Sequence, residues 1–219
     1  MTKDEVRARI EKLAIIPAIR ASSREDAVFA CEAVALGGIP IAEITMTVPG
    51  AEDLLGALRQ SHSDLIVGAG TVLDLETARR CLDRGAMFLT SPGLETDLVE
   101  FAARQGVLVM PGALTPTEVL AAWKAGGDMV KVYPCSQVGG PKYIKALKGP
   151  FPQIPVIASG GVNHHTASEF ILAGASALGI GGNLIPKEAI QMRQPERIRE
   201  LARRFLGMVA EARALMLPQ

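Results

Sequence analysis

Residues 107–134, VLVMPGALTPTEVLAAWKAGGDMVKVYP, contain the unit from which the fold can be predicted. An apolar run at 107–112 is followed by an amphipathic stretch that stops at Gly126, and a second apolar run occupies 129–134. Strands that are apolar along their whole length are those covered on both faces, as in a parallel sheet with crossover helices. The stretch therefore predicts a strand, a returning helix and a second, parallel strand.

The same unit recurs along the whole chain. The chain has eight apolar runs, seven of which end in Gly, Pro, Ser or Thr, and their starts lie about 20 to 26 residues apart, the length of one strand plus one helix. They occupy 15–19, 40–45, 65–70, 87–91, 107–112, 129–134, 155–160 and 177–182. Eight such units without a Rossmann fingerprint favour an α/β fold closed into a (β/α)8 barrel, the TIM barrel, over an open doubly wound sheet.

The segments outside this repeat are helical. An additional N-terminal helix is expected at 3–13, before the first strand, and the longest helix at 194–217. Each helix between strands stops at a glycine, which predicts left-handed helix caps at Gly37, Gly85, Gly106, Gly126 and Gly174. No linker or low-complexity tract divides the chain, so residues 1–219 are predicted to form one domain.

The composition excludes several classes of protein. Lys plus Arg equals Asp plus Glu at 23 each, and charged residues make up 21% of the chain, so no strong field would attract nucleic acid. No apolar run approaches the roughly 18 residues of a membrane-spanning helix, and the N-terminus lacks the apolar region of a signal peptide. Three widely spaced cysteines predict neither a disulfide framework nor a structural zinc. We therefore expect a soluble, cytoplasmic protein that binds neither membranes nor nucleic acid.

Polar residues at the carboxyl ends of the strands are the candidates for chemistry, because barrels of this type build their active sites there. Glu43 and Lys131 lie inside apolar runs, where a charge is costly unless it is paired or takes part in a reaction. Both belong to even-numbered strands, so both can point into the barrel and converge on one ligand. The alternative is a buried Lys–Glu ion pair without catalytic activity. The candidates are Arg20, Glu43, Thr45, Thr47, Thr71, Ser91, Lys131, Ser159 and Asn183.

Lys131 is the only lysine within a predicted strand. A desolvated lysine amine gives up its proton more readily, and the neutral amine attacks a ketone to form a Schiff base. The histidines His62, His164 and His165 form no facial triad, which disfavours metal chemistry.

Glycine pairs follow the seventh and eighth strands, in ASGGVN and GIGGN. Loops at these two positions commonly bind phosphate through backbone N–H groups, and glycine permits the close approach. The glycines therefore favour a phosphorylated ligand.

In order and spacing, motifs along nearly the whole chain resemble the class I 2-keto-3-deoxy-6-phosphogluconate (KDPG) aldolases, also called 4-hydroxy-2-oxoglutarate (KHG) aldolases. The motifs are EITMTVPGA at 43–51, GAGTVLD at 68–74, SPG at 91–93, MPGALTPTE at 110–118, KVYP at 131–134, GPKYIKALKGPFP at 140–152, SGGVN at 159–163 and GIGGNLIP at 179–186. Sister aldolases that act on the galactonate epimer share much of this pattern.

The resemblance implies a reversible aldol cleavage that forms pyruvate without a metal or cofactor. It makes Lys131 the lysine that forms the imine and Glu43 the proton shuttle. Thr71 falls on the threonine that helps to hold the pyruvate carboxylate, and Thr47 stands where several members have arginine. Arg20 is then the best remaining cation for a carboxylate or phosphate. The substrate-binding residues implied are Arg20, Thr71, Pro92, Gly160, Gly161, Gly182 and Asn183, the last in place of a serine, and the family resemblance also implies a homotrimer.

Two other classes of function stay open at this point. An epimerase or a synthase of the thiamine-phosphate type would explain the glycines after the seventh and eighth strands, but it would not need Lys131 inside the barrel. A catalytically silent sugar-phosphate binder or an assembly scaffold could also retain the fold, because fold does not determine function.

Overall fold

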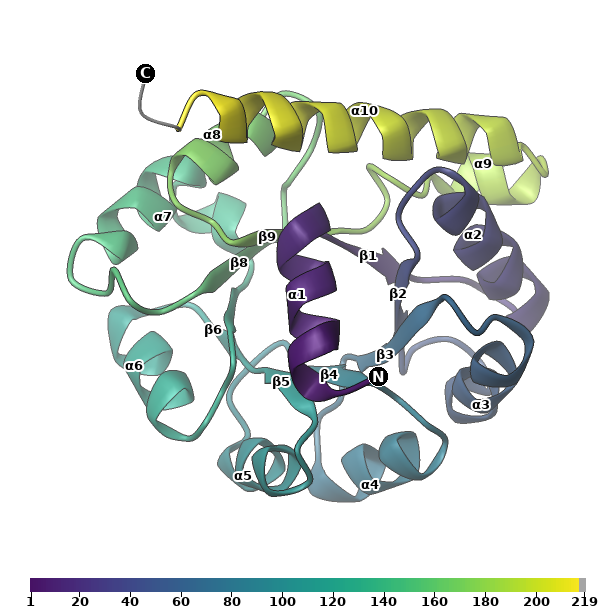
Figure 1. The fold of residues 1–219 in the computed structure, drawn as a ribbon, viewed down its shortest axis with the longest axis horizontal. Helices are drawn as coiled ribbons and strands as arrows, with labels where there is room; N and C mark the ends of the chain where they lie inside the picture. Colours follow the sequence, from purple (N-terminus) through teal and green to yellow (C-terminus); the bar gives the residue numbers. More distant parts are fainter. Residues whose placement is uncertain (217–219) are drawn as a thin grey trace.

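The computed structural model describes residues 1–216, and within them a parallel sheet curves into a barrel surrounded by helices (Figure 1). The order of neighbouring strands is β5-β4-β3-β2-β1-β9-β8-β7-β6, and every pairing is parallel. The strands are β1 (Ile15–Ile19), β2 (Ile41–Thr45), β3 (Ile66–Gly70), β4 (Phe88–Thr90), β5 (Leu108–Met110), β6 (Gly112–Ala113), β7 (Val130–Val132), β8 (Val156–Ser159) and β9 (Ala177–Ile180). The predicted (β/α)8 architecture is confirmed.

The helices follow the strands as the repeat requires. They are α1 (Lys3–Leu13), α2 (Arg24–Leu36), α3 (Ala51–Ser61), α4 (Leu75–Asp83), α5 (Thr96–Arg104), α6 (Pro116–Lys124), α7 (Pro141–Lys148), α8 (Ala167–Leu172), α9 (Lys187–Gln191) and α10 (Pro195–Ala214), with a short 3₁₀ turn, η1 (Cys135–Val138), after β7. The strands are buried almost throughout, because helices cover the outside of the barrel and side chains fill its interior.

The predicted strand at 107–112 is divided in the structure into β5 and β6. Pro111 lies between them and has no N–H to donate, so it interrupts the ladder. β5 pairs with β4, whereas β6 pairs with β7. The barrel still closes here, because Asp128 N donates to Val109 O at 2.9 Å and Lys131 N donates to Pro111 O at 2.8 Å.

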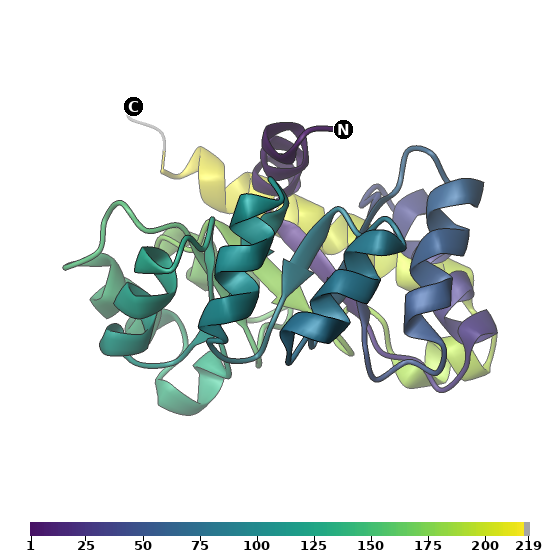
Figure 2. The ribbon, with the colours of Figure 1, turned by 90° about the horizontal axis from the view of Figure 1, so that it is seen from below.

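Helix α1 covers the end of the barrel where the strands begin. Its Val6 and Ile10 are buried, and a capping box between Thr2 and Glu5 fixes its first turn. Figure 2 shows α1 on one side of the barrel and the turn after β7 on the other. The expected N-terminal helix is confirmed, and it leaves the carboxyl ends of the strands free for a site.

The last helix, α10, packs against α2 and α8 along one side of the barrel (Figure 1). The structure confirms the long helix predicted at 194–217. Residue 217 lies outside the described residues, and so do the last residues, 218 and 219, of the predicted domain 1–219. The prediction of a left-handed cap at Gly37 is wrong. Gly38, with φ +102°, takes that conformation, whereas Gly37 has φ −77° and allows α10 to approach closely, since a Cβ there would lie 2.6 Å from Ala202 Cβ.

Over residues 1–216, no helix is both long enough and apolar enough to cross a membrane. The same part of the chain contains no group of three or more His, Cys, Asp or Glu side chains placed to hold a metal ion. Cys31, Cys81 and Cys135 are free thiols, and all three are buried.

Candidate active site

Lys131 and Glu43 meet inside the barrel. The Nζ atom of Lys131 on β7 lies 3.3 Å from Oε1 and 3.5 Å from Oε2 of Glu43 on β2. Glu43 is 2% exposed and Lys131 is 7% exposed, so the pair is almost fully withdrawn from water. The predicted convergence of the two side chains from opposite walls of the barrel is confirmed. A carboxylate at this distance can accept a proton from the ammonium group.

A third polar side chain reaches the same amine. Lys131 Nζ also donates to Oγ1 of Thr90, the last residue of β4, at 3.3 Å. Thr90 is not among the candidates predicted from the sequence, which include its neighbour Ser91. Alternate strands supply the same interior layers of the barrel, which is the rule that predicted the meeting of Glu43 and Lys131. Thr90 ends the fourth strand, so the same rule predicts its position beside them.

Lys131 opens onto a pocket of about 230 Å³ at the carboxyl ends of the strands. Of the predicted substrate-binding residues, five line this pocket: Arg20, Gly160, Gly161, Gly182 and Asn183. Tyr133 and Gly179, which are not among the predicted site residues, also line the pocket, and the candidate Ser159 lies beside Gly179. The absence of a side chain at Gly179 leaves part of this space open.

The loops after β8 and β9 form one wall of the pocket. Within the described chain, the backbone N–H groups of Gly161, Val162, Gly182 and Asn183 donate to no protein acceptor. The side chain of Asn183 joins the two loops, because its Nδ2 donates to Val162 O at 2.8 Å. Asn183 is therefore a brace between the loops as well as part of the pocket wall. The unpaired N–H groups are suited to an anion.

Thr71 and Pro92 lie apart from this pocket, at the ends of β3 and β4. Thr71 has φ +58°, a left-handed conformation that a β-branched residue rarely adopts and that costs about 1–3 kcal/mol. Pro92 lines a separate hollow of about 220 Å³ beside Val72. The turn at 91–93 is held in place by Ser91 Oγ, which donates to Gly93 O at 2.6 Å.

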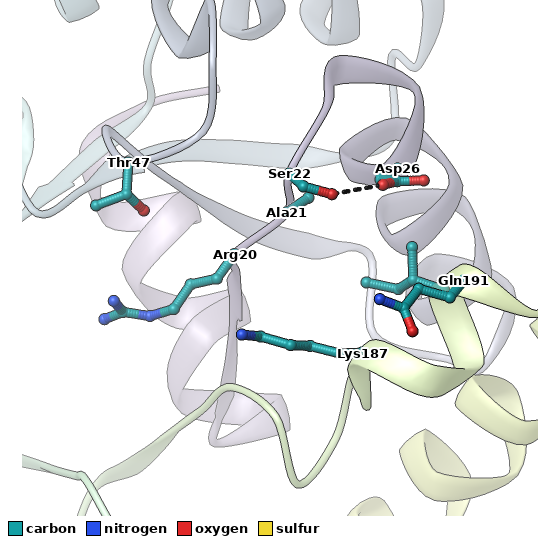
Figure 3. A pocket seen from close by; sticks show the side chains of 8 residues that line it. Arg20, Ala21, Ser22, Asp26, Thr47, Lys187 and Gln191 are labelled. Atoms are coloured by element: carbon teal, nitrogen blue, oxygen red, sulfur yellow. Dashed lines mark hydrogen bonds between the residues drawn. The ribbon is translucent and has the colours of Figure 1, made fainter.

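Arg20 also lines a second pocket, of about 300 Å³, at the mouth of the barrel. Figure 3 shows Arg20 and Lys187 extending in the same direction along this pocket, with the ammonium group of Lys187 directed toward Arg20. Neither cation has an ion-pair partner among residues 1–216. The carboxylate in the pocket, Asp26, is already bound by Arg193 at 3.0 Å and by Ser22 at 3.0 Å. The pocket therefore presents two free positive charges.

Other candidates from the sequence have structural roles. Thr45 Oγ1 donates to Ile19 O at 3.0 Å and lies 2.7 Å from Thr47 Oγ1, which ties the end of β2 to the end of β1. Cys135, under the loop after β8, has its Sγ 3.2 Å from Gly160 O. Burial raises the pKa of this thiol to about 11, so it is not a nucleophile at neutral pH.

Comparison with known proteins places this site in a family. The family model described as KDPG and KHG aldolase matches residues 6–201. The KHG/KDPG aldolase of Escherichia coli K12 is 33% identical over 190 residues, which cover 86% of this chain and 89% of that enzyme. The 2-dehydro-3-deoxy-6-phosphogalactonate aldolase of the same strain is 33% identical over 175 residues, covering 79% and 85%.

A solved structure is also similar over nearly the full length. The KDPG aldolase of Legionella pneumophila, with pyruvate captured at low pH as a covalent carbinolamine intermediate, has a TM-score of 0.84 and 30% identity. The similarity covers 90% of this chain and 96% of that one. Because the family match spans most of the barrel and includes both strands that carry the Lys131–Glu43 pair, the chain belongs to the KDPG and KHG aldolase family.

Proposed function

We propose that this protein is a class I aldolase that cleaves 2-keto-3-deoxy-6-phosphogluconate to pyruvate and glyceraldehyde 3-phosphate. The observation that carries the proposal is the buried Lys131 Nζ, 3.3 Å from Glu43 Oε1, at the base of an open pocket. Membership of the aldolase family supports the same chemistry. A purely structural ion pair would not need a pocket that reaches its lysine.

The reaction needs one amine and one carboxylate. Glu43 accepts a proton from Lys131, and the neutral amine attacks the C2 ketone to give a carbinolamine. Loss of water, with Glu43 supplying the proton to the departing hydroxyl, forms the protonated imine. Glu43, again a carboxylate, accepts the proton of the C4 hydroxyl as the C3–C4 bond breaks, and the electron pair of that bond moves through C3 to the imine nitrogen. Glu43 protonates C3 of the resulting enamine, and hydrolysis releases pyruvate.

The carboxylate end of the substrate is assigned to the ends of β3 and β4. Thr71 and the turn at Pro92 are the residues that the family resemblance places there. The strained backbone of Thr71 supports this assignment, since strain of this kind gathers at functional sites. A carboxylate held there would leave the far end of the substrate to the loops after β8 and β9.

The phosphate end is assigned to the unpaired N–H groups of Gly161, Val162, Gly182 and Asn183. Arg20 borders both this pocket and the pocket at the mouth, so its guanidinium supplies a positive charge beside the phosphate. Lys187 adds a second positive charge on the same side (Figure 3). The two cations offset the absence of an arginine at Thr47.

Borohydride reduction in the presence of pyruvate tests the proposal. The secondary amine formed by reducing a pyruvate imine should be found by peptide mass spectrometry on Lys131 and on no other lysine. Glu43→Gln should retain the shape of the site but slow hydrogen exchange at the methyl group of pyruvate by on the order of 100-fold or more. If wild-type protein forms no adduct, the chain is a silent binder or scaffold.

The galactonate epimer is the second candidate substrate. The observation that favours it is the 2-dehydro-3-deoxy-6-phosphogalactonate aldolase among the relatives, which is 33% identical to this chain. The two phosphorylated substrates differ in configuration at C4, so parallel measurement of kcat/KM for both, and for 4-hydroxy-2-oxoglutarate, decides between them.

We further propose a homotrimer in the cytoplasm, on the basis of the family resemblance. Large apolar side chains, Leu36, Leu73 and Met192, are more than half exposed and are available to an interface. Sedimentation equilibrium would reveal a trimer by its mass.

A further inference from the structure

Thr90 is a buried hydroxyl whose partner is the reacting amine. It is 1% exposed, and Lys131 Nζ donates to its Oγ1 at 3.3 Å. No other side chain of residues 1–216 is hydrogen-bonded to this oxygen. A buried hydroxyl without a partner is costly, and a valine would fill nearly the same volume without that cost. Packing therefore does not account for a threonine at this position.

The placement of Thr90 follows the layering of the barrel. Alternate strands supply the side chains of one interior layer. The second, fourth and sixth units supply Glu43, Thr90 and Lys131, while the eighth supplies Gly179, which lines the same pocket as Lys131. Three polar side chains thus surround a space that the glycine leaves open for substrate.

We propose that Thr90 is a positioning residue for the amine of Lys131, an inference that rests on the proposed Schiff-base function. After Glu43 has taken one proton, the neutral amine retains two N–H bonds. Donation of one of them to Thr90 Oγ1 restricts rotation about the Cε–Nζ bond and aims the lone pair into the pocket. Once the protonated imine has formed, its single N–H has Thr90 and Glu43 as the acceptors within reach.

The proposal predicts how the rate of imine formation depends on this hydroxyl. Thr90→Val should slow borohydride trapping of pyruvate and lower kcat by on the order of 10- to 100-fold, the effect of losing one hydrogen bond to a charged group. KM for the substrate should change by less than about threefold, because Thr90 positions the amine rather than the ligand. Thr90→Ser restores the hydroxyl and should recover most of the rate.

A pH profile separates positioning from a loss of packing. The charged and titratable groups around Lys131 are Glu43 on β2, Arg20 after β1 and Tyr133 after β7, and all remain in these variants. Thr90 accepts a stronger hydrogen bond from the ammonium than from the neutral amine, so its removal favours the neutral form. In Thr90→Val the acidic limb of the trapping profile should move to lower pH, whereas a variant that is merely less stable would keep the wild-type profile.

The experiment is borohydride trapping with pyruvate across pH on wild type, Thr90→Val and Thr90→Ser, with thermal unfolding of each. A slow Val variant with a displaced profile and a nearly normal Ser variant supports the proposal. Wild-type rates and profile in Thr90→Val, or equal losses in Val and Ser that follow their melting temperatures, would overturn it. Failure of the wild type to form any adduct would instead overturn the Schiff-base function, and the role of Thr90 with it.

Discussion

The carboxylate of Glu43 lies in the space that a side chain at position 70 would fill, and this space is open because residue 70 is glycine. A Cβ atom on residue 70 would lie 2.2 Å from Glu43 Oε1 and 2.5 Å from Glu43 Cγ. β2 and β3 are paired in parallel, with Thr45 opposite Gly70. The missing side chain on β3 therefore lets Glu43 lie along the neighbouring strand and reach Lys131.

Gly70→Ala is expected to displace the Glu43 carboxylate. The rate of cleavage should fall by about 10-fold or more, because proton transfer depends on the position of this group. Overpacking should also lower the free energy of unfolding by about 1–3 kcal/mol. Gly56→Ala, in helix α3, is the matched control, because the atom nearest to a Cβ on residue 56 is Arg84 O at 3.7 Å. An unchanged kcat in Gly70→Ala would show that Glu43 does not carry out the proton transfer.

Lys131→Met is expected to abolish cleavage and also to destabilise the fold. The substitution leaves Glu43, which is 2% exposed, without its charge partner, and breaking a buried pair costs about 3–5 kcal/mol. Adding Glu43→Gln removes the unpaired charge and should recover much of this stability without recovering activity. Urea unfolding of the two single variants and the double variant measures the coupling free energy between Lys131 and Glu43. If the effects of the two substitutions on the free energy of unfolding are additive, the two side chains do not stabilise each other.

Gly182→Leu tests the phosphate site without straining the fold. No atom lies within 4 Å of a Cβ on residue 182, so the side chain should affect only what enters the pocket. KM for the phosphorylated substrate should rise about 10-fold, while KM for 4-hydroxy-2-oxoglutarate should change little. Gly161 is unsuitable for this test, because it has φ +88° and a Cβ there would lie 2.2 Å from Ser136 Cβ. Equal increases for both substrates would mean that this loop does not select phosphate.

The sequence was sufficient to predict the barrel and the pair at its centre. Periodicity located the strands, and the rule that alternate strands share interior layers of the barrel predicted that Glu43 and Lys131 meet, although they are 88 residues apart. Thr90 also lies on an even-numbered strand, but it resembles an ordinary β-branched strand residue until its distance to Lys131 is known. The linkage by which Asn183 braces the two loops depends on loop conformation, which periodicity does not report. Lys187 was overlooked because it belongs to a helix rather than to a strand end.

Acid should weaken the first turn of α6 through Glu118. Hydrogen bonds from the backbone N–H groups of Thr115 and Leu114 hold the pKa of this carboxyl below its usual value of 4.5. A carboxyl whose pKa is lower in the folded state stabilises the fold above its unfolded pKa, and this contribution is lost as pH falls through the folded pKa. Below about pH 4.5, the melting temperature of Glu118→Gln should therefore fall less steeply with pH than that of the wild type. Glu211→Gln, on the exposed face of α10, should show the same dependence of melting temperature on pH as the wild type. Identical slopes in both variants would show that this cap does not contribute to acid stability.

Lys187→Met is expected to weaken recognition of the phosphorylated end of the substrate. Lys187 and Arg20 are both exposed at the mouth pocket, and an exposed charge contact is worth about 1 kcal/mol at most. KM for the phosphorylated substrate should therefore rise by about 3- to 5-fold with little change in kcat. The difference from wild type should shrink as salt is raised, because salt screens exposed charges. Lys124→Met removes the same charge from the exposed end of α6, away from the pocket, and should change neither constant. A loss in Lys187→Met that persists at high salt, or that appears equally in Lys124→Met, would exclude a direct contact between Lys187 and the substrate anion.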